Sequence, residues 1–398
     1  MISVKQALSV IRKLKYNIGT EYIIPEKALG RIASENIISK TDNPPFNMSA
    51  MDGYAVCNKS SNNTYKVVDE IFAGNKSNRR VFKNEAVRVY TGSKLPINTK
   101  TVIIQENTKV INNNFILLKN NNLKKGEYIR KKGLDFEKNK TVVKKGKILS
   151  ARDIALIISA NCKRIKVYKK PKISILSTGN ELLLTKKKQK DSNIYASSLY
   201  MLEALINLSY SECNYKTIVK DEKNKIKKEI KKAIKSDIII TTGGVSVGKK
   251  DLIRSCLIEL GYKEKFWKIM MRPGKPLLFG TFKNKPIFSL PGNPVSTYVC
   301  FFIFVLPFLK KLLRLNTISD NKKAKLINSI PSISKRESYL RGFYFKYKNE
   351  YLVKCLSDQD SSLLKMLAIS NCLIKIPAKS NKYLKNKLVE IISLPNLF

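Results

Sequence analysis

Three acidic residues follow predicted strands in the middle of the chain, where their carboxylates could share one metal ion. Glu181, Asp221 and Asp251 each come shortly after a run of strand-forming residues. If these strands are parallel neighbours, their carboxyl ends lie at one edge of a sheet, which is where such folds bind ligands. Three carboxylates there would suit Mg²⁺. The competing interpretation is unrelated caps and solvated acids, and residue type alone favours a helix cap for Asp251.

The stretch TTGGVSVGKKD, residues 241–251, has the composition of an anion-binding loop between a strand and a helix. Its glycines allow backbone N–H groups to face an anion, and the following helix N-terminus adds positive potential. The spacing matches neither a Walker A loop nor a dinucleotide fingerprint. The predicted ligand-binding residues of the loop are Gly243, Gly244, Ser246 and Gly248.

Two proline- and glycine-containing turns could bind an oxyanion. In MMRPGKPLLFG, residues 270–280, Arg272 and Lys275 flank a tight turn and could both reach one anion. A solvated turn explains that spacing equally well. In SLPGNPVS, residues 289–296, a rigid turn places Ser296 in the first turn of an apolar helix, and a helix cap without a ligand is the competing view. The turn itself supplies Pro291, Gly292 and Asn293.

Alternating strands and helices are predicted from residue 172 to residue 313. Strands are expected at 172–178, 216–219 and 237–242, followed by a hairpin of two strands within 275–290; helices are expected at 197–208, 224–236 and 251–260. This alternation is typical of a mostly parallel sheet with crossover helices. The apolar run 299–313 is interpreted as a buried helix. Its uncharged part is too short to span a bilayer, and Pro307 interrupts it.

The flanking regions have a different texture. Short strands and turns dominate residues 40–147 and return after residue 321, which predicts β-rich domains on both sides. A helix is expected at 150–161, with Ser150 as its N-cap and Asp153 at the third helical position.

Composition excludes several kinds of chemistry. The chain has 76 Lys and Arg against 30 Asp and Glu, a net charge of +46, and no His. A Ser-His-Asp triad and a His-ligated zinc are therefore impossible. The seven cysteines contain no C-x-x-C pair, which favours free thiols over a metal or disulfide framework. The lysines are dispersed along the chain, which favours a solvated surface over a specific nucleic-acid site.

Seven motifs occur in the order found in one known family. They are PPFNMSAMDGYAV, RVYTGSKLP, STGNEL, DSN, TTGGVSVGKKD, RPGKP and LPGNPVS. Over nearly its whole length the chain resembles the molybdopterin molybdenumtransferase family, of the MoeA type, similar to the E domain of gephyrin. Each motif alone is weak; on residue type, for example, MDGYA is an ordinary turn.

The resemblance implies a cytoplasmic transferase that inserts molybdenum from molybdate into adenylylated molybdopterin, assisted by Mg²⁺, and releases AMP and molybdenum cofactor. It implies an elongated multidomain α/β plus β fold and a homodimer with its active cleft at the interface. Transient contacts with the adenylyltransferase, molybdoenzymes or their chaperones are expected. No membrane and no specific nucleic acid are expected. An adenylyltransferase and a non-catalytic basic scaffold or nucleic-acid binder are the alternatives.

The resemblance also assigns roles to residues of this chain. Its catalytic acids would be Asp52, Asp135, Glu181, Asp221 and Asp251, and the last three would hold the metal. Thr91 matches a further family position, and the oxyanion-site residues would be Arg272, Lys275, Ser296, Arg341 and Ser361. Arg272 stands where the family usually has Lys, which keeps the charge but changes the geometry.

The domain boundaries implied are a linking region at 1–38 plus 140–170 and an inserted β-rich domain at 39–139. A molybdopterin-binding α/β domain at 171–318 and a C-terminal β-barrel domain at 319–398 follow. The same resemblance implies that the first ~19 residues pack on the α/β domain.

Overall fold

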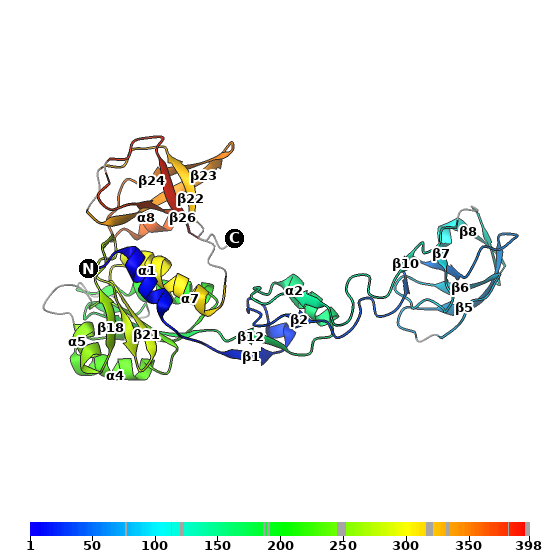
Figure 1. The fold of residues 1–398 in the computed structure, drawn as a ribbon, viewed down its shortest axis with the longest axis horizontal. Coiled ribbons are helices and arrows are strands. Elements are labelled where there is room, and N and C mark those ends of the chain that lie inside the picture. Colours follow the sequence, from blue (N-terminus) through cyan, green and yellow to red (C-terminus); the bar gives the residue numbers. More distant parts are fainter. Residues whose placement is uncertain are drawn as a thin grey trace. The chain divides into compact units, whose positions relative to one another are not determined.

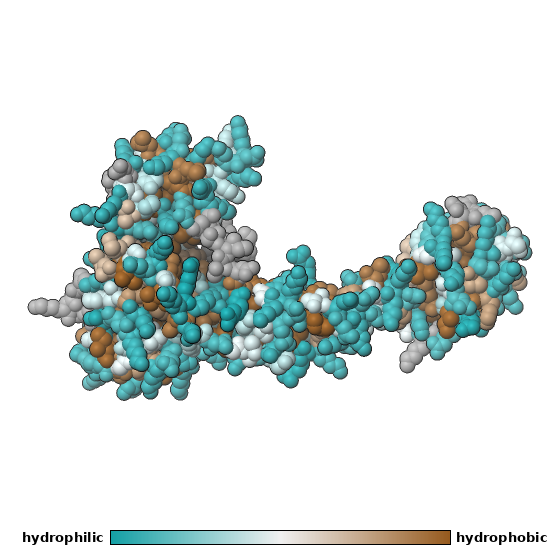
Figure 2. Space-filling view, in the orientation of Figure 1, coloured by the Kyte–Doolittle hydropathy of each residue, from teal (hydrophilic) through white to brown (hydrophobic). Residues whose placement is uncertain are grey.

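The computed structural model forms two compact units, shown in Figure 1. The larger unit comprises Met1–Gly19 and Tyr168–Phe398, and the smaller unit comprises Thr20–Val167. The structure describes residues 1–75, 78–112, 114–119, 123–185, 188, 192–244, 252–315, 321–331, 335–380 and 382–394. Hydrophilic residues are spread over the visible face of both units (Figure 2), as expected for dispersed lysines.

A six-stranded sheet is the centre of the larger unit. Its order is β16 (Glu212–Val219), β13 (Lys172–Thr178), β17 (Ile238–Thr242), β21 (Lys285–Leu290), β20 (Leu278–Phe282) and β18 (Lys263–Trp267). The first four strands run parallel, and β20 is antiparallel to both of its neighbours, β21 and β18. The mostly parallel sheet is therefore confirmed. β16 begins before the predicted residue 216 because it is an edge strand, whose alternating exposure keeps polar residues at its start.

Helices cover both faces of this sheet. On one face, α4 (Lys223–Ala233) and α5 (Leu252–Glu259) bury Ile226, Ile230 and Leu257 in a common core. On the other, α3 (Ser197–Leu208) packs against α6 (Pro294–Cys300), and α1 (Val4–Lys13) against α7 (Leu306–Leu312). The helical spacing of apolar residues predicts that each helix buries one face, but it does not predict which element that face packs against.

The prediction that Pro307 interrupts the apolar helix is wrong. The helix runs unbroken from Pro294 to Leu312, with a π-helical segment, η3 (Phe301–Val305), just before the proline. A wider turn there accommodates the proline ring and its missing N–H. By length and composition the helix could cross a membrane, but 72% of its apolar 18-residue stretch is buried, which is typical of a core helix.

The C-terminal part of the larger unit is a closed barrel. Its strands are β22 (Asn321–Leu326), β23 (Glu337–Tyr347), β24 (Glu350–Cys355), β25 (Cys372–Ile376) and β26 (Leu388–Ser393). They pair in the order β23-β24-β22-β26-β25, and β23 pairs with β25 to close the ring. The short helix α8 is Leu364–Ala368. The predicted C-terminal β-barrel is thus confirmed.

The smaller unit is built on a second six-stranded sheet. Its order is β7 (Thr101–Ile104), β4 (Gly53–Val56), β6 (Glu85–Val89), β5 (Thr64–Ile71), β9 (Phe115–Leu118) and β8 (Thr108–Asn112). Two-stranded pairings complete it: β1 (Thr20–Ile23) with β12 (Ile165–Tyr168), β2 (Ile37–Ile38) with β11 (Thr141–Val143), and β3 (Met48–Ser49) with β10 (Ile129–Arg130). The 3₁₀ turns are η1 (Pro25–Lys27) and η2 (Gln105–Asn107).

The helix α2 (Ala151–Ser159) in the smaller unit begins as its sequence predicts. Ser150 accepts a hydrogen bond from the amide of Asp153, and Asp153 accepts one from the amide of Ser150. Asp153 is also paired with Lys147 at 2.5 Å. This reciprocal capping satisfies amides that the first helical turn leaves unpaired.

Candidate functional site

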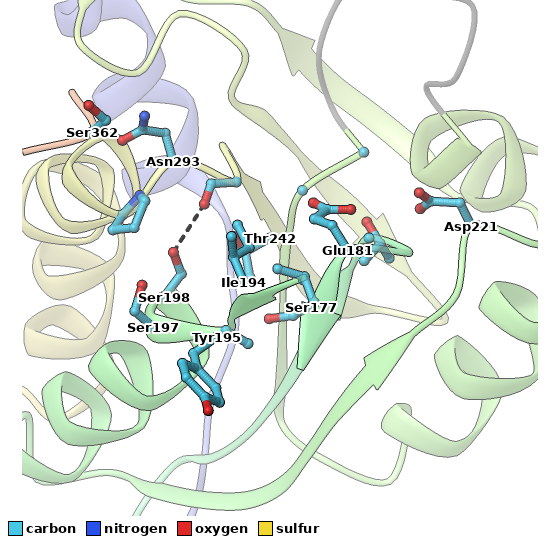
Figure 3. A pocket seen from close by; sticks show the side chains of 18 of the residues that line it. Ser177, Glu181, Ile194, Tyr195, Ser197, Ser198, Asp221, Thr242, Asn293 and Ser362 are labelled. Atoms are coloured by element: carbon cyan, nitrogen blue, oxygen red, sulfur yellow. Dashed lines mark hydrogen bonds between the residues drawn. The ribbon is translucent and has the colours of Figure 1, made fainter. Parts of the chain in front are cut away.

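A cavity of about 710 Å³ lies at the carboxyl ends of the parallel strands in the larger unit. Figure 3 shows Glu181 and Asp221 at one end and Ser198, Asn293 and Ser362 at the other. The residues between belong to the ends of β13 and β17 and to the start of α3. The location is the one that a parallel sheet makes available to a ligand.

Two of the three acids predicted to converge do line this cavity. β16 and β17 both pair with β13, so the residues after these strands meet at one edge of the sheet. The amide of Asp221 donates to the side chain of Asn180 at 3.1 Å, which ties the segment after β16 to the one after β13. Asp251 lies outside the described residues, as do Ser246 and Gly248. Among the residues the structure describes, no three acids or cysteines form a metal-binding group.

The Glu181 carboxylate folds back over the turn that carries it. A Cβ atom at Gly179 would lie 2.6 Å from Oε1 of Glu181. The segment is held by β14 (Leu182–Leu183), which pairs with β15 (Ile194–Tyr195), and by the Asn193 side chain, which donates to the carbonyl of Glu181 at 3.3 Å. These contacts hold the main chain of the turn that carries Glu181.

The first glycine of the predicted anion loop is required by the fold itself. Gly243 has φ of +86°, and a Cβ there would lie 2.4 Å from the carbonyl oxygen of Thr178. The position is both left-handed and too close to β13 for any side chain. Gly243 and Gly244 form part of the cavity wall. Gly243 and Gly244 therefore approach β13 closely while they line the cavity.

Two buried hydroxyls in the cavity wall have no hydrogen-bond partner within the described part of the chain. Ser177 is 1% exposed and Thr178 is 5% exposed. Neither hydroxyl has a hydrogen-bond partner among the described residues. A buried hydroxyl without a partner costs free energy, about 1–3 kcal/mol. A polar ligand in the cavity would remove that cost.

The LPGNPVS turn is held by three hydroxyl groups from different elements. Thr242 and Thr297 donate to the carbonyl of Pro291 at 2.9 and 2.6 Å. Ser198, at the start of α3, donates to the carbonyl of Gly292 at 3.0 Å (Figure 3). The predicted residues Gly292 and Asn293 line the cavity, and Pro291 is buried behind them.

The predicted oxyanion residues lie outside the cavity lining, at the junction of the α/β part and the barrel. β19 (Met271–Arg272) pairs with residues 337 and 338 at the start of β23, so Arg272 is attached to the barrel. Lys275 follows in the same turn, and Ser296 is 6% exposed in α6. Two hydrogen bonds from Ser362 lower the pKa of Asp360, and the positive charges of Arg341 and Arg272 lower it further.

Arg341 is buried, and the loop before α8 closes over it. It is 1% exposed and donates from Nη1 to the carbonyl of Asp360 at 2.9 Å and from Nη2 to that of Asp358 at 3.0 Å. Burial lowers the pKa of Arg341. Its Nε has no partner among the described residues. These bonds hold the loop that carries Ser361, a predicted site residue, and Ser362, which lines the cavity.

In the smaller unit, two predicted site residues are bonded to each other. Thr91 donates from its amide and from its hydroxyl to one oxygen of Asp52. These two bonds, with a smaller contribution from Arg88, lower the pKa of Asp52. Asp135 accepts a hydrogen bond from the side chain of Asn43 at 3.0 Å.

Several cavity residues were not predicted from the sequence. Apart from the serines and Thr178 already described, they include Leu182, Ile194, Tyr195, Ser197 and Leu364. Ser197 begins a helix whose start was predicted correctly, so a site at that N-terminus could have been considered. The contribution of Ser362 and Leu364 depends on how the barrel packs, which no local pattern reveals.

Family models cover almost the whole chain. Residues 2–161 match the MoeA N-terminal region (domain I and II), residues 174–311 match a probable molybdopterin binding domain, and residues 323–394 match the MoeA C-terminal region (domain IV). The fold and these matches define a protein of molybdenum cofactor biosynthesis.

Individual relatives narrow this class. A molybdopterin molybdenumtransferase from Haemophilus influenzae is 32% identical over 94% of each chain, and one from Nostoc sp. is 33% identical over 97% of this chain and 92% of the relative. The crystal structure of a molybdopterin biosynthesis MoeA protein from Pyrococcus horikoshii matches 100% of both chains, with a TM-score of 0.86 and 30% identity. The chain belongs to the MoeA-type molybdopterin molybdenumtransferase family.

Proposed function

We propose that this chain inserts molybdenum from molybdate into adenylylated molybdopterin and releases AMP and molybdenum cofactor. Molybdenum insertion is supported by the three family models and by relatives at about 30% identity over nearly the full chain. The observation that carries the proposal is the cavity with Glu181 and Asp221 at one end and, in its wall, buried hydroxyls that find no partner among the residues the structure describes. A net charge of +46 favours the approach of anionic substrates.

The donor set at the acidic end fits Mg²⁺. Mg²⁺ is commonly held by one or two carboxylates, with waters and substrate phosphates completing its octahedron. Glu181 and Asp221 would supply the carboxylates, with Asp251 as a third proposed ligand. When bound, the ion would neutralise phosphate charge in the nucleotide ester and polarise the phosphorus–oxygen bond.

The second substrate, molybdate, is a tetrahedral dianion that needs cationic and hydroxyl donors. We assign this role to Arg272, Lys275, Ser296 and Ser361. Arg341 acts mainly on the loop, because its two terminal nitrogens already donate to main-chain carbonyls. The dithiolene of the pterin supplies the sulfur ligands to molybdenum, so no protein cysteine is required. All seven cysteines are free thiols, in keeping with the proposed cytoplasmic location.

The test is AMP release from adenylylated molybdopterin in the presence of Mg²⁺. The purified protein is assayed with molybdate and, as a matched control, with sulfate, a tetrahedral dianion that cannot deliver a metal. Release that requires molybdate supports the proposal. Release of AMP at the same rate with sulfate, or no release at all, would refute it. Formation of the AMP ester from ATP and molybdopterin would instead favour an adenylyltransferase.

A further inference from the structure

A side-chain amide holds the strand that carries Arg341 in the barrel. The amide of Arg341 donates to Oε1 of Gln359 at 2.9 Å, and Nε2 of Gln359 donates to the carbonyl of Arg341 at 3.0 Å. Gln359 therefore pairs with β23 as another strand would. Its Nε2 also donates to the carbonyl of Leu356 at 2.8 Å, which anchors the beginning of the loop.

The loop is also held from the opposite direction by the guanidinium of Arg341. Its bonds to the carbonyls of Asp358 and Asp360 lie on either side of Gln359 in the sequence. The backbone and side chain of Arg341 together thus bind three consecutive loop residues, 358 to 360. Because Arg341 is 1% exposed, these bonds are shielded from water and are stronger than exposed ones.

The hydrogen bonds between Arg341 and the loop continue to the cavity through two acidic residues. The amide of Asp360 donates to the carboxylate of Asp358 at 2.9 Å. The amide and hydroxyl of Ser362 donate to the carboxylate of Asp360 at 2.7 and 2.6 Å. Ser362 lines the cavity. A continuous chain of hydrogen bonds therefore runs from β23 through the loop to the cavity wall.

The same strand also positions the arginine turn. Residues Glu337 and Ser338 of β23 pair with Met271 and Arg272, and the amide of Glu337 donates to the carbonyl of Met270 at 3.2 Å. Arg272 and the 358–362 loop are therefore both held by β23: Arg272 pairs with Ser338, and the loop is bonded to Arg341, three residues further along the strand. Any slip of the loop on this strand changes the spacing between Arg272 and Ser361.

We infer that Gln359 is a positioning residue for the oxyanion half of the site. It sets the distance between Ser361 and Arg272 by pairing the loop with β23, and it contacts neither substrate. This inference rests on the proposed function, because Ser361 and Arg272 are assigned to molybdate there. It predicts that loss of Gln359 weakens the use of molybdate and leaves the nucleotide ester largely unaffected.

The test compares Gln359→Ala with Asn371→Ala. Asn371 makes the same pair of bonds to Tyr344 of β23, at 2.7 and 2.8 Å, but belongs to no part of the site. For Gln359→Ala the KM for molybdate should rise about tenfold, the cost of a lost hydrogen bond or two, with the KM for adenylylated molybdopterin within about twofold of wild type. Saturating molybdate should restore most of kcat. Asn371→Ala should lose comparable thermal stability without a change in either KM.

The outcomes separate the inference from the proposed function. Equal KM values for molybdate in both variants would reduce Gln359 to a structural role and overturn the inference. A wild-type protein that shows no molybdate-dependent AMP release would overturn the proposed function itself. If Gln359→Ala does not fold, Gln359→Glu keeps the acceptor for the Arg341 amide and removes both donors. Amide hydrogen exchange at Asp360 and Ser362, which should accelerate only in Gln359 variants, gives a readout without catalysis.

Discussion

Thr91 donates two hydrogen bonds to a single oxygen of Asp52, from its amide at 2.7 Å and from its hydroxyl at 2.8 Å. β4 and β6 are antiparallel, with Gly53 opposite Val89, so Asp52, just before β4, lies near Thr91, two residues after the end of β6. Two motifs that are almost 40 residues apart, MDGYA and YTG, are thereby joined in one local structure.

Replacing Thr91 by Val should raise the pKa of Asp52 toward its ordinary value, because one of two hydrogen bonds to the ionised form is lost. A ¹³C titration of the aspartate carboxyls, with the Asp52 signal assigned through Asp52→Asn, measures this. Thr91→Ser, which keeps the hydroxyl, should leave the pKa low. An unchanged pKa in Thr91→Val would show that the amide bond alone is responsible.

The lowered pKa of Asp52 also fixes the sign of its contribution to pH-dependent stability. The contribution is fully present above the unfolded-state pKa of ~3.9 and is lost as the pH falls through the lower folded-state value. Denaturant titrations of wild type and Thr91→Val should therefore differ above about pH 4 and converge in stronger acid. A difference that grows in acid would contradict this account.

Gly243 offers a test of the close approach between the loop and β13. Gly243→Ala meets both an unfavourable φ and the carbonyl of Thr178, whereas Gly261→Ala, at φ +89° with no atom within 4 Å of the added Cβ, meets only the first. We expect about 1 kcal/mol of destabilisation for Gly261→Ala and at least about twice that for Gly243→Ala. Urea denaturation gives both values. Equal costs would mean that the loop relaxes away from β13.

Metal dependence tests the acidic end of the cavity. Asp221→Asn keeps the shape of the side chain but removes a negative charge that Mg²⁺ needs. The Mg²⁺ concentration that gives half-maximal activity should therefore rise at least about tenfold. Glu222→Gln, next to it, changes the same charge at an exposed position that pairs only with Lys225 among the described contacts. It should leave the Mg²⁺ requirement unchanged. Chelation with EDTA should abolish wild-type activity, and activity that persists would exclude the metal.

The proposed homodimer predicts complementation between inactive variants. If the active cleft takes residues from both subunits, co-refolded Asp52→Ala and Asp221→Ala chains should regain part of the wild-type activity, since mixed dimers contain one intact site. Light scattering of the wild type should give twice the mass of the 45.3 kDa chain. A monomeric mass, or mixtures as inactive as either variant, would contradict the shared cleft.

The sequence predicted local elements and their order better than it predicted contacts between them. The strand 172–178 and the helix 197–208 occur as predicted, because each has a strong apolar period and clear ends. The convergence of Glu181 and Asp221 followed from strand direction alone. The prediction that Pro307 interrupts the helix failed because the effect of a proline depends on whether the preceding helical turn can widen.

The parts that sequence reasoning missed depend on packing between distant segments. Ser362 reaches the cavity only because the barrel closes against the α/β part, and Gln359 pairs with Arg341 across a turn whose geometry no local pattern encodes. The burial of Arg341 was likewise unforeseen, since a lone arginine in a strand normally keeps its charge in water.

The most direct test of the central claim is the stoichiometry of a single turnover. Enzyme in excess of adenylylated molybdopterin is mixed with molybdate and Mg²⁺, and the AMP released and the molybdenum bound to the re-isolated pterin are both quantified. Our account predicts one molybdenum in the pterin for each AMP, with neither product formed when molybdate is omitted. AMP release that proceeds while the pterin stays free of molybdenum would contradict it.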